Sequence, residues 1–196
     1  MPARSGAGRM ADGSRGASVP LGLVTLPNAI TLARLCAVPL AVWLVLRHDL
    51  AVAFGLFVAA GASDAVDGWL ARHGRASAVG AVLDPVADKV LLVSMYVTLA
   101  SIEVLPAWIA ILVVFRDLLI VGGVLLLGVV GQPVAIRPLF ISKVNTALQI
   151  VLVAAALLLS ALGVPARALL APLLWVVAAS TLASGAAYVR RTAWLR

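Results

Sequence analysis

Six long apolar segments follow a polar N-terminal region and are separated by short polar or turn-forming stretches. They cover residues 28–47, 50–71, 82–102, 105–130, 139–162 and 167–190. Each approaches the ~20 residues that an α-helix needs to cross a hydrocarbon core of about 30 Å. Backbone groups in lipid must be hydrogen-bonded within their own segment, so the pattern predicts helices. We therefore expect an all-α integral membrane protein, with six transmembrane helices in one bundle that forms a single domain over residues 21–196.

Composition agrees with burial in lipid. Of 196 residues, 63% are hydrophobic and 12% are charged, whereas ordinary soluble domains carry roughly half apolar and a quarter charged residues. The net charge is +7, but the basic residues are spread between the apolar segments and at the ends, which argues against nucleic-acid binding. Cys36 is the only cysteine, so a disulfide or a cysteine-based zinc site within one chain is excluded.

The distribution of basic residues predicts an orientation. Residues 1–20 are mainly Gly, Ala, Ser and Arg, which is typical of a disordered basic tail. Basic residues gather in this tail, between the second and third apolar segments, and at the C-terminus: Arg4, Arg9, Arg15, Arg72, Arg75, Arg190, Arg191 and Arg196. The bias places both termini in the cytoplasm. We expect a bacterial cytoplasmic membrane, with the mitochondrial inner membrane as the alternative.

Half of the eight acidic residues lie in or beside two apolar segments. Asp64 and Asp67 are three residues apart, and Asp84 and Asp88 are four apart, so each pair shares a helix face. A carboxylate at bilayer depth is costly and generally faces a cavity or a ligand. Four neighbouring carboxylates need cations, and oxygen ligands suit Mg²⁺ or Mn²⁺. The alternative is that the acids are neutralised separately by basic side chains: Arg72, Lys89 or Arg116.

Nearby residues suit a phosphate-bearing substrate. Gly68 and Gly80 have no side chain, which lets a bulky nucleotide or phosphate approach the backbone. Arg72 offers a planar guanidinium that matches phosphate oxygens.

Together these residues resemble the signature of the CDP-alcohol phosphotransferase family, D-x2-D-G-x2-A-R followed by G-x3-D-x3-D. The chain reads D-A-V-D-G-W-L-A-R over residues 64–72 and G-A-V-L-D-P-V-A-D over residues 80–88. The resemblance implies that two divalent cations are held by four residues: Asp64, Asp67, Asp84 and Asp88. It also implies that Asp88 serves as general base. The CDP moiety would be lined by Gly68, Ala71, Arg72 and Gly80.

Two further stretches bear on the acceptor alcohol. Residues 26–34 resemble the start of the first helix in the phosphatidylglycerophosphate and cardiolipin synthase branch. Residues 137–149 (R-P-L-F-I-S-K-V-N-T-A-L-Q) are similar to a segment of eukaryotic-type cardiolipin synthases. Glycerophosphate-accepting relatives usually have Gly and Lys where this chain has Ser142 and Asn145. The resemblance implies that the acceptor contacts Arg34, Arg116, Arg137, Ser142, Lys143 and Asn145.

These similarities favour transfer of the phosphatidyl group of CDP-diacylglycerol to phosphatidylglycerol, giving cardiolipin and CMP. Transfer to glycerol 3-phosphate is the alternative within the same chemistry. A cation channel or transporter is an alternative of another class, because six helices with intramembrane carboxylates also suit ion transport. The family resemblance also implies a homodimer.

Overall fold

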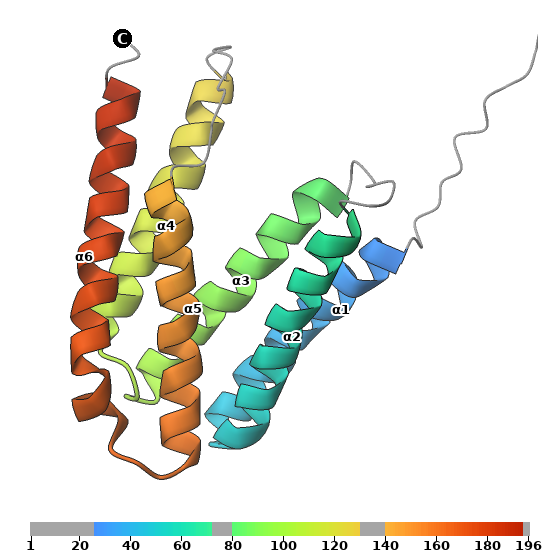
Figure 1. Cartoon of the computed structure of the whole chain (residues 1–196), viewed down its shortest axis with the longest axis vertical. Helices are drawn as coiled ribbons and strands as arrows, with labels where there is room; N and C mark the ends of the chain where they lie inside the picture. Colours follow the sequence, from blue (N-terminus) through green and yellow to red (C-terminus); the bar gives the residue numbers. More distant parts are fainter. Residues whose placement is uncertain (1–25, 72–79, 130–139, 194–196) are drawn as a thin grey trace, which may run out of the picture.

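Six α-helices and no strand make up the described part of the chain (Figure 1). The computed structural model describes residues 26–71, 80–129 and 140–193, with side chains for 32–63, 87–123, 140–188 and 190. The helices are α1 (Leu26–Leu46), α2 (Leu50–Ala71), α3 (Gly80–Ser101), α4 (Ala107–Val129), α5 (Phe140–Ala161) and α6 (Ala166–Ala193). The six predicted segments are thereby confirmed as helices. The predicted tail, residues 1–20, lies outside the described residues.

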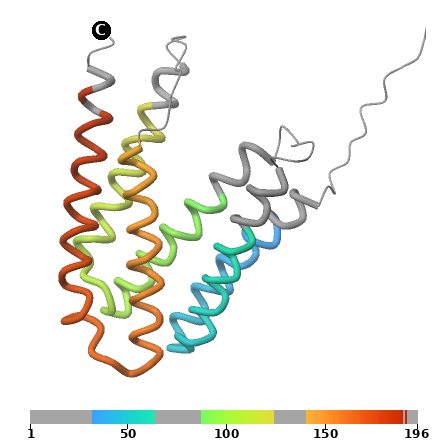
Figure 2. The backbone as a smooth tube through the Cα atoms, viewed as in Figure 1, coloured from blue at the N-terminus to red at the C-terminus, as the bar shows by residue number. Residues whose placement is uncertain are grey.

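The helices alternate in direction and form two groups of three. Helix α1 packs against α2 and α3, and α6 packs against α4 and α5. The groups are joined where α3 contacts α4 and α5, and where α2 contacts α5. Figure 2 shows them close together at the end where α1, α3 and α5 finish, and diverging toward the end where α3 begins.

Three helices finish in tight turns at the converging end. His48, Glu103 and Gly163 have positive φ angles, of 61°, 60° and 66°. Each lies just past a helix whose last carbonyls accept two backbone hydrogen bonds, as in the bonds from His48 N to Val45 O (3.0 Å) and from Asp49 N to Leu44 O (3.0 Å). This is the Schellman arrangement, which usually places glycine at the positive-φ residue. Two of the three turns here use a residue with a side chain.

The turn after α3 is also fixed to the start of α6. Arg167 donates from Nε (2.9 Å) and Nη2 (2.6 Å) to the carbonyl oxygen of Glu103. These bonds join the two three-helix groups at the converging end.

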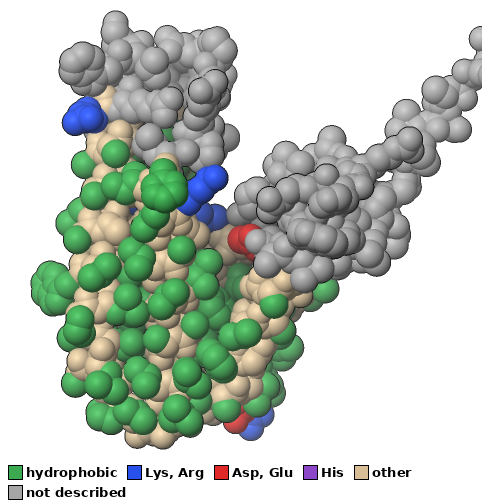
Figure 3. Space-filling model, viewed as in Figure 1, with side chains coloured by type: hydrophobic (Ala, Val, Ile, Leu, Met, Phe, Trp, Pro, Cys, Tyr) green, Lys and Arg blue, Asp and Glu red, His purple; other side chains and the backbone are tan. Residues whose placement is uncertain are grey.

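Apolar side chains predominate both in the interior and on the exterior of the described bundle. Its core contains the fully buried side chains of Met95, Tyr96, Leu99, Leu152 and Leu157. The face in Figure 3 is mostly hydrophobic between charged side chains at its two ends. Two segments of the described chain are long and apolar enough to cross a membrane: Phe140–Ala161 and Ala166–Tyr188.

Candidate active site

The four predicted metal-binding aspartates lie at similar depths on α2 and α3. Asp64 and Asp67 precede the end of α2, at Ala71, by seven and four residues, and Asp84 and Asp88 follow the start of α3, at Gly80, by four and eight. At 1.5 Å per residue, all four lie about 6 to 12 Å along their helices from the connection between them. Of the four, only Asp88 has a described side chain.

Asp88 is bonded to a buried arginine of α1. The Oδ1 atom of Asp88 accepts a hydrogen bond of 2.7 Å from Nη1 of Arg34. The Arg34 side chain is 2% exposed, whereas that of Asp88 is 41% exposed. Arg34 was predicted to contact the acceptor, and the structure shows that its guanidinium is bonded to the carboxylate of the predicted general base. The arginine fixes the orientation of a carboxylate that still faces open space.

That open space is a pocket of about 600 Å³ between α2, α3 and α5. Asp88, Lys89 and Thr146 contribute polar groups to its wall. The rest of the wall is apolar or backbone: Phe57, Val58, Ala60, Gly61, Ala62, Leu91, Leu92, Ile150 and Ala154. Val58 and Ile150 of this wall are exposed side chains. The pocket therefore combines a polar region at Asp88 with walls that suit hydrocarbon.

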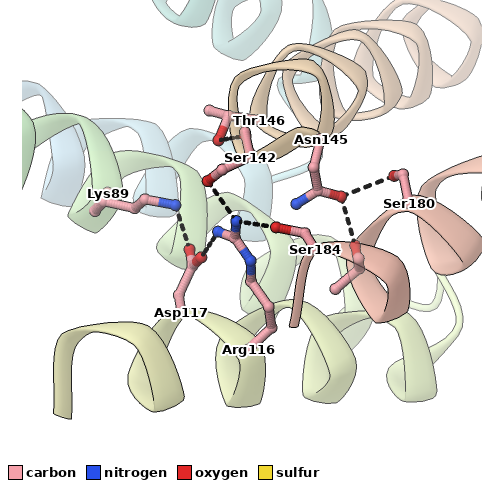
Figure 4. Close-up of polar contacts among 9 residues, drawn as sticks. Lys89, Arg116, Asp117, Ser142, Asn145, Thr146, Ser180 and Ser184 are labelled. Carbon is pink, nitrogen blue, oxygen red and sulfur yellow. Dashed lines mark hydrogen bonds and ion pairs between the residues drawn. The ribbon is translucent and has the colours of Figure 1, made fainter. Parts of the chain in front are cut away.

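Beside the pocket, Arg116 of α4 is the centre of a buried polar network (Figure 4). Its Nη1 atom donates to Oδ1 of Asp117 at 2.6 Å. Its Nη2 atom donates to Ser142 Oγ of α5 and to Ser184 Oγ of α6, both at 2.6 Å. Arg116 thus joins α4, α5 and α6 at the predicted acceptor segment, and its guanidinium is buried.

Asp117 accepts hydrogen bonds from two cations. Besides Arg116, Lys89 of α3 donates from Nζ to Oδ2 of Asp117 at 2.7 Å. Sequence reasoning offered Lys89 and Arg116 as partners that would neutralise the aspartate cluster. In the structure both are bonded to Asp117, a residue of α4 outside that cluster. Lys89 and Arg116 therefore pair with Asp117, whereas Asp88, the one cluster member with a described side chain, pairs with a different cation, Arg34.

Asn145 joins α5 to α6 one turn deeper than Ser142. Its Oδ1 atom accepts hydrogen bonds of 2.8 Å from the hydroxyls of Ser180 and Thr181. Asn145 is fully buried, and its Nδ2 atom has no hydrogen-bond partner within the described residues.

The remaining predicted site residues divide into three groups. Lys143 is exposed in the first turn of α5. The backbones of Gly68, Ala71 and Gly80 lie on α2 and α3, whereas Arg72 and Arg137 lie outside the described residues.

Sequence reasoning missed the partners from α4 and α6: Asp117, Ser180, Thr181 and Ser184. The three hydroxyl residues lie within five positions of an apolar helix, a pattern that predicts a polar stripe on α6. The sequence does not indicate which side chains that stripe contacts.

The candidate metal ligands suit a hard divalent cation. Every candidate ligand is a carboxylate, without histidine or cysteine, and Asp88 keeps a half-exposed carboxylate at the pocket wall. Where side chains are described, no three His, Cys, Asp or Glu residues come together, since only Asp88 of the four is included.

Comparison with known proteins gives matches across this region. A family model described as CDP-alcohol phosphatidyltransferase matches residues 24–183, which include all four aspartates. A cardiolipin synthase (CMP-forming) of Rattus norvegicus is 33% identical over 179 residues, which cover 83% of this chain and 59% of that protein. A chloroplastic CDP-diacylglycerol–glycerol-3-phosphate 3-phosphatidyltransferase 1 of Oryza sativa subsp. japonica is 36% identical, over 84% of this chain and 56% of that protein.

A third relative is matched over more of its own length. It is a CDP-diacylglycerol–glycerol-3-phosphate 3-phosphatidyltransferase of Bacillus subtilis, 33% identical over 69% of this chain and 78% of that protein. The chain spans little more than half the length of the rat and rice proteins.

Proposed function

Because the chain belongs to the CDP-alcohol phosphatidyltransferase family, we propose that it transfers the phosphatidyl group of CDP-diacylglycerol to phosphatidylglycerol, releasing CMP and forming cardiolipin. The observation that carries this proposal is the Arg34–Asp88 pair at the polar wall of an apolar pocket. A lipid substrate needs both features at once, since its reacting phosphate is polar and its chains are not. Membership of an enzyme family argues against the channel or transporter alternative.

In the proposed reaction Asp88 takes the proton from the free hydroxyl of the acceptor's glycerol headgroup. The hydroxyl oxygen forms a bond to the phosphorus that carries diacylglycerol. The bond from that phosphorus to the oxygen bridging to CMP breaks, and CMP leaves with the bridging oxygen. Arg34 supports this step by holding Asp88 in one orientation, because general-base catalysis depends on the geometry between base and proton.

The remaining donor-side roles follow the family signature. When bound, two divalent cations, Mg²⁺ or Mn²⁺, would neutralise the diphosphate oxygens of the donor. Their proposed ligands are Asp64, Asp67, Asp84 and Asp88. The CDP moiety would lie against Gly68, Ala71, Arg72 and Gly80.

We place the acceptor headgroup beside the start of α5. Lys143 is exposed there, and Ser142 is bonded to Arg116. The choice of acceptor is supported by Asn145, which stands where glycerophosphate-accepting relatives usually have lysine. Asn145 is fully buried against two hydroxyls, and an added charge at such a position is costly unless it is paired. Fewer cations near the acceptor suit a phosphodiester monoanion better than the dianion of glycerol 3-phosphate.

Phosphatidylglycerophosphate synthesis is the second candidate. The rice and Bacillus relatives are named for transfer to glycerol 3-phosphate, and the Bacillus protein is matched over most of its length. This reaction would use the same pocket and the same aspartates. Only the acceptor would differ.

We further propose that all six helices span a membrane, with both termini on the cytoplasmic side. This proposal is supported by the exposed apolar side chains of the bundle, such as Ile111, Leu118 and Trp175. We also propose that this membrane is the bacterial cytoplasmic membrane and that the protein forms a homodimer.

The test is CMP release by the purified protein with CDP-diacylglycerol and Mn²⁺ or Mg²⁺. Phosphatidylglycerol and glycerol 3-phosphate are supplied in separate reactions, and a reaction with EDTA serves as the control. CMP release with phosphatidylglycerol, accompanied by cardiolipin, is expected. Release only with glycerol 3-phosphate would reject the acceptor and keep the chemistry, and no release with either would reject both.

A further inference from the structure

Lys89 has a place in the pocket that neither the signature nor the predicted acceptor segment assigns. It follows Asp88 in α3, and both side chains line the same pocket. Asp88 points to Arg34 of α1, whereas Lys89 points to Asp117 of α4. The ammonium group of Lys89 therefore lies on the side of the pocket that faces the acceptor segment.

Among the described residues, the ion pairs at Asp117 leave one positive charge in excess. Asp117 is buried and accepts hydrogen bonds from both Lys89 and Arg116. Ser142 and Ser184, the other partners of Arg116, are neutral. Three charged groups thus form a cluster with a net charge of +1, which favours an anion nearby.

The exposed fraction of each side chain shows which of the two cations can contact an anion in the pocket. The Lys89 side chain is 35% exposed, whereas that of Arg116 is 5% exposed. Arg116 is held by three partners from α4, α5 and α6, and Figure 4 shows its guanidinium enclosed by them. Lys89 approaches Asp117 from the other side and has two further donor hydrogens on Nζ. Lys89 is thus the cation that faces the pocket.

We propose that Lys89 binds the phosphate anion of the acceptor substrate and that Asp117 is a positioning residue that holds Lys89 in place. The inference rests on the proposed phosphatidyl transfer but not on which acceptor is used, because phosphatidylglycerol and glycerol 3-phosphate both carry a phosphate. Asp117 contacts no substrate; it acts through Lys89, while Arg116 supplies its second hydrogen bond.

The test measures KM for donor and acceptor and kcat, using whichever acceptor supports CMP release by the unchanged protein. Lys89→Met leaves Asp117 paired with Arg116, so the buried charges stay balanced. We expect KM for the acceptor to rise about tenfold or more, as for the loss of a charge-assisted hydrogen bond. KM for CDP-diacylglycerol should change less than about twofold, and Lys89→Arg should recover most of the loss. Arg190→Met removes an exposed cation near the end of α6 and should change neither constant.

Asp117→Asn tests the positioning role. Alone, it should raise KM for the acceptor about threefold, because an amide holds an ammonium more weakly than a carboxylate does. In the Lys89→Met background it should have no further effect on that constant. An additive effect of the two changes would show that Asp117 does not act through Lys89.

Two other results would overturn the assignment of Lys89. One is an unchanged KM for the acceptor in Lys89→Met, and the other is an equal rise in both KM values. Circular dichroism and gel filtration in detergent establish that each variant is folded. If Lys89→Met does not fold, Lys89→Gln replaces it, with the same expected results. A protein that uses only glycerol 3-phosphate would refute the proposed acceptor yet leave this test intact.

Discussion

Replacing Arg34 by Met removes the guanidinium that holds Asp88 and leaves the packing of α1 almost unchanged. The two side chains have similar lengths, and the Arg34 side chain is nearly fully buried. Removing one partner of an ion pair is costly when the charge left behind stays buried and unpaired. Asp88, at 41% exposure, can recover hydration at the pocket. We therefore expect the free energy of unfolding to change by only about 1 kcal/mol.

Activity should respond far more strongly than stability. Without Arg34 the Asp88 carboxylate loses a contact that orients it toward the acceptor hydroxyl, and general-base catalysis typically contributes about 10²- to 10⁴-fold to a rate. We expect kcat to fall about 100-fold, with both KM values little changed. Arg34→Lys keeps the positive charge but loses the planar fork, so its kcat should lie between those of Arg34→Met and the unchanged protein.

The assay is CMP release at varied donor and acceptor concentrations, together with thermal unfolding in the same detergent. The kinetic constants distinguish two roles of Arg34. One is to position Asp88 through the observed ion pair, and the other is the contact with the acceptor that was predicted from sequence. A residue that contacts the acceptor would raise KM for that substrate and leave kcat nearly unchanged. That pattern in Arg34→Met would refute the positioning role argued from the structure.

Three other predictions concern catalysis, packing and a turn. Asp88→Asn should fold and still be stabilised thermally by CDP-diacylglycerol, while CMP release falls about 10²- to 10⁴-fold; substantial turnover would remove Asp88 from the base role. Gly123→Ala should lower the unfolding temperature relative to Gly122→Ala, because its Cβ would lie 3.2 Å from Cε1 of Tyr188 whereas nothing lies within 4 Å at Gly122; equal temperatures would contradict this packing. His48→Gly should stabilise the protein by about 1 kcal/mol in thermal unfolding by relieving a positive φ, and a loss of stability would show that the imidazole contributes more than the backbone strain costs.

The helices were predictable because each apolar segment has about the length of a helix that can cross a bilayer. Predicted and observed boundaries differ by at most three residues, at the end of α6. Turn residues such as Gly163 mark the boundaries well. Pro39 and Pro172 lie inside helices without ending them, since apolar surroundings sustain a helix through a proline that would often break it in water.

The site was predictable only in part, because its polar contacts join distant parts of the chain. The spacing of the aspartates indicates shared helix faces, which is local information. The partner of Arg34 is 54 residues away, and Ser184 is 68 residues from Arg116. Helix periodicity cannot choose among such partners. Asp117 likewise gains its role toward Lys89 only from the packing of α3 beside α4.

The position of the pocket wall has a consequence for kinetics. Val58 of α2 and Ile150 of α5 line the pocket and are exposed. With the membrane-spanning arrangement proposed above, a lipid would reach Asp88 sideways, from within the bilayer plane. Its supply is then two-dimensional, and the rate follows the mole fraction of substrate among surrounding lipids, not its amount per volume. Diluting both lipid substrates with inert phospholipid or detergent should slow the enzyme even at constant bulk concentration. Adding buffer alone should not.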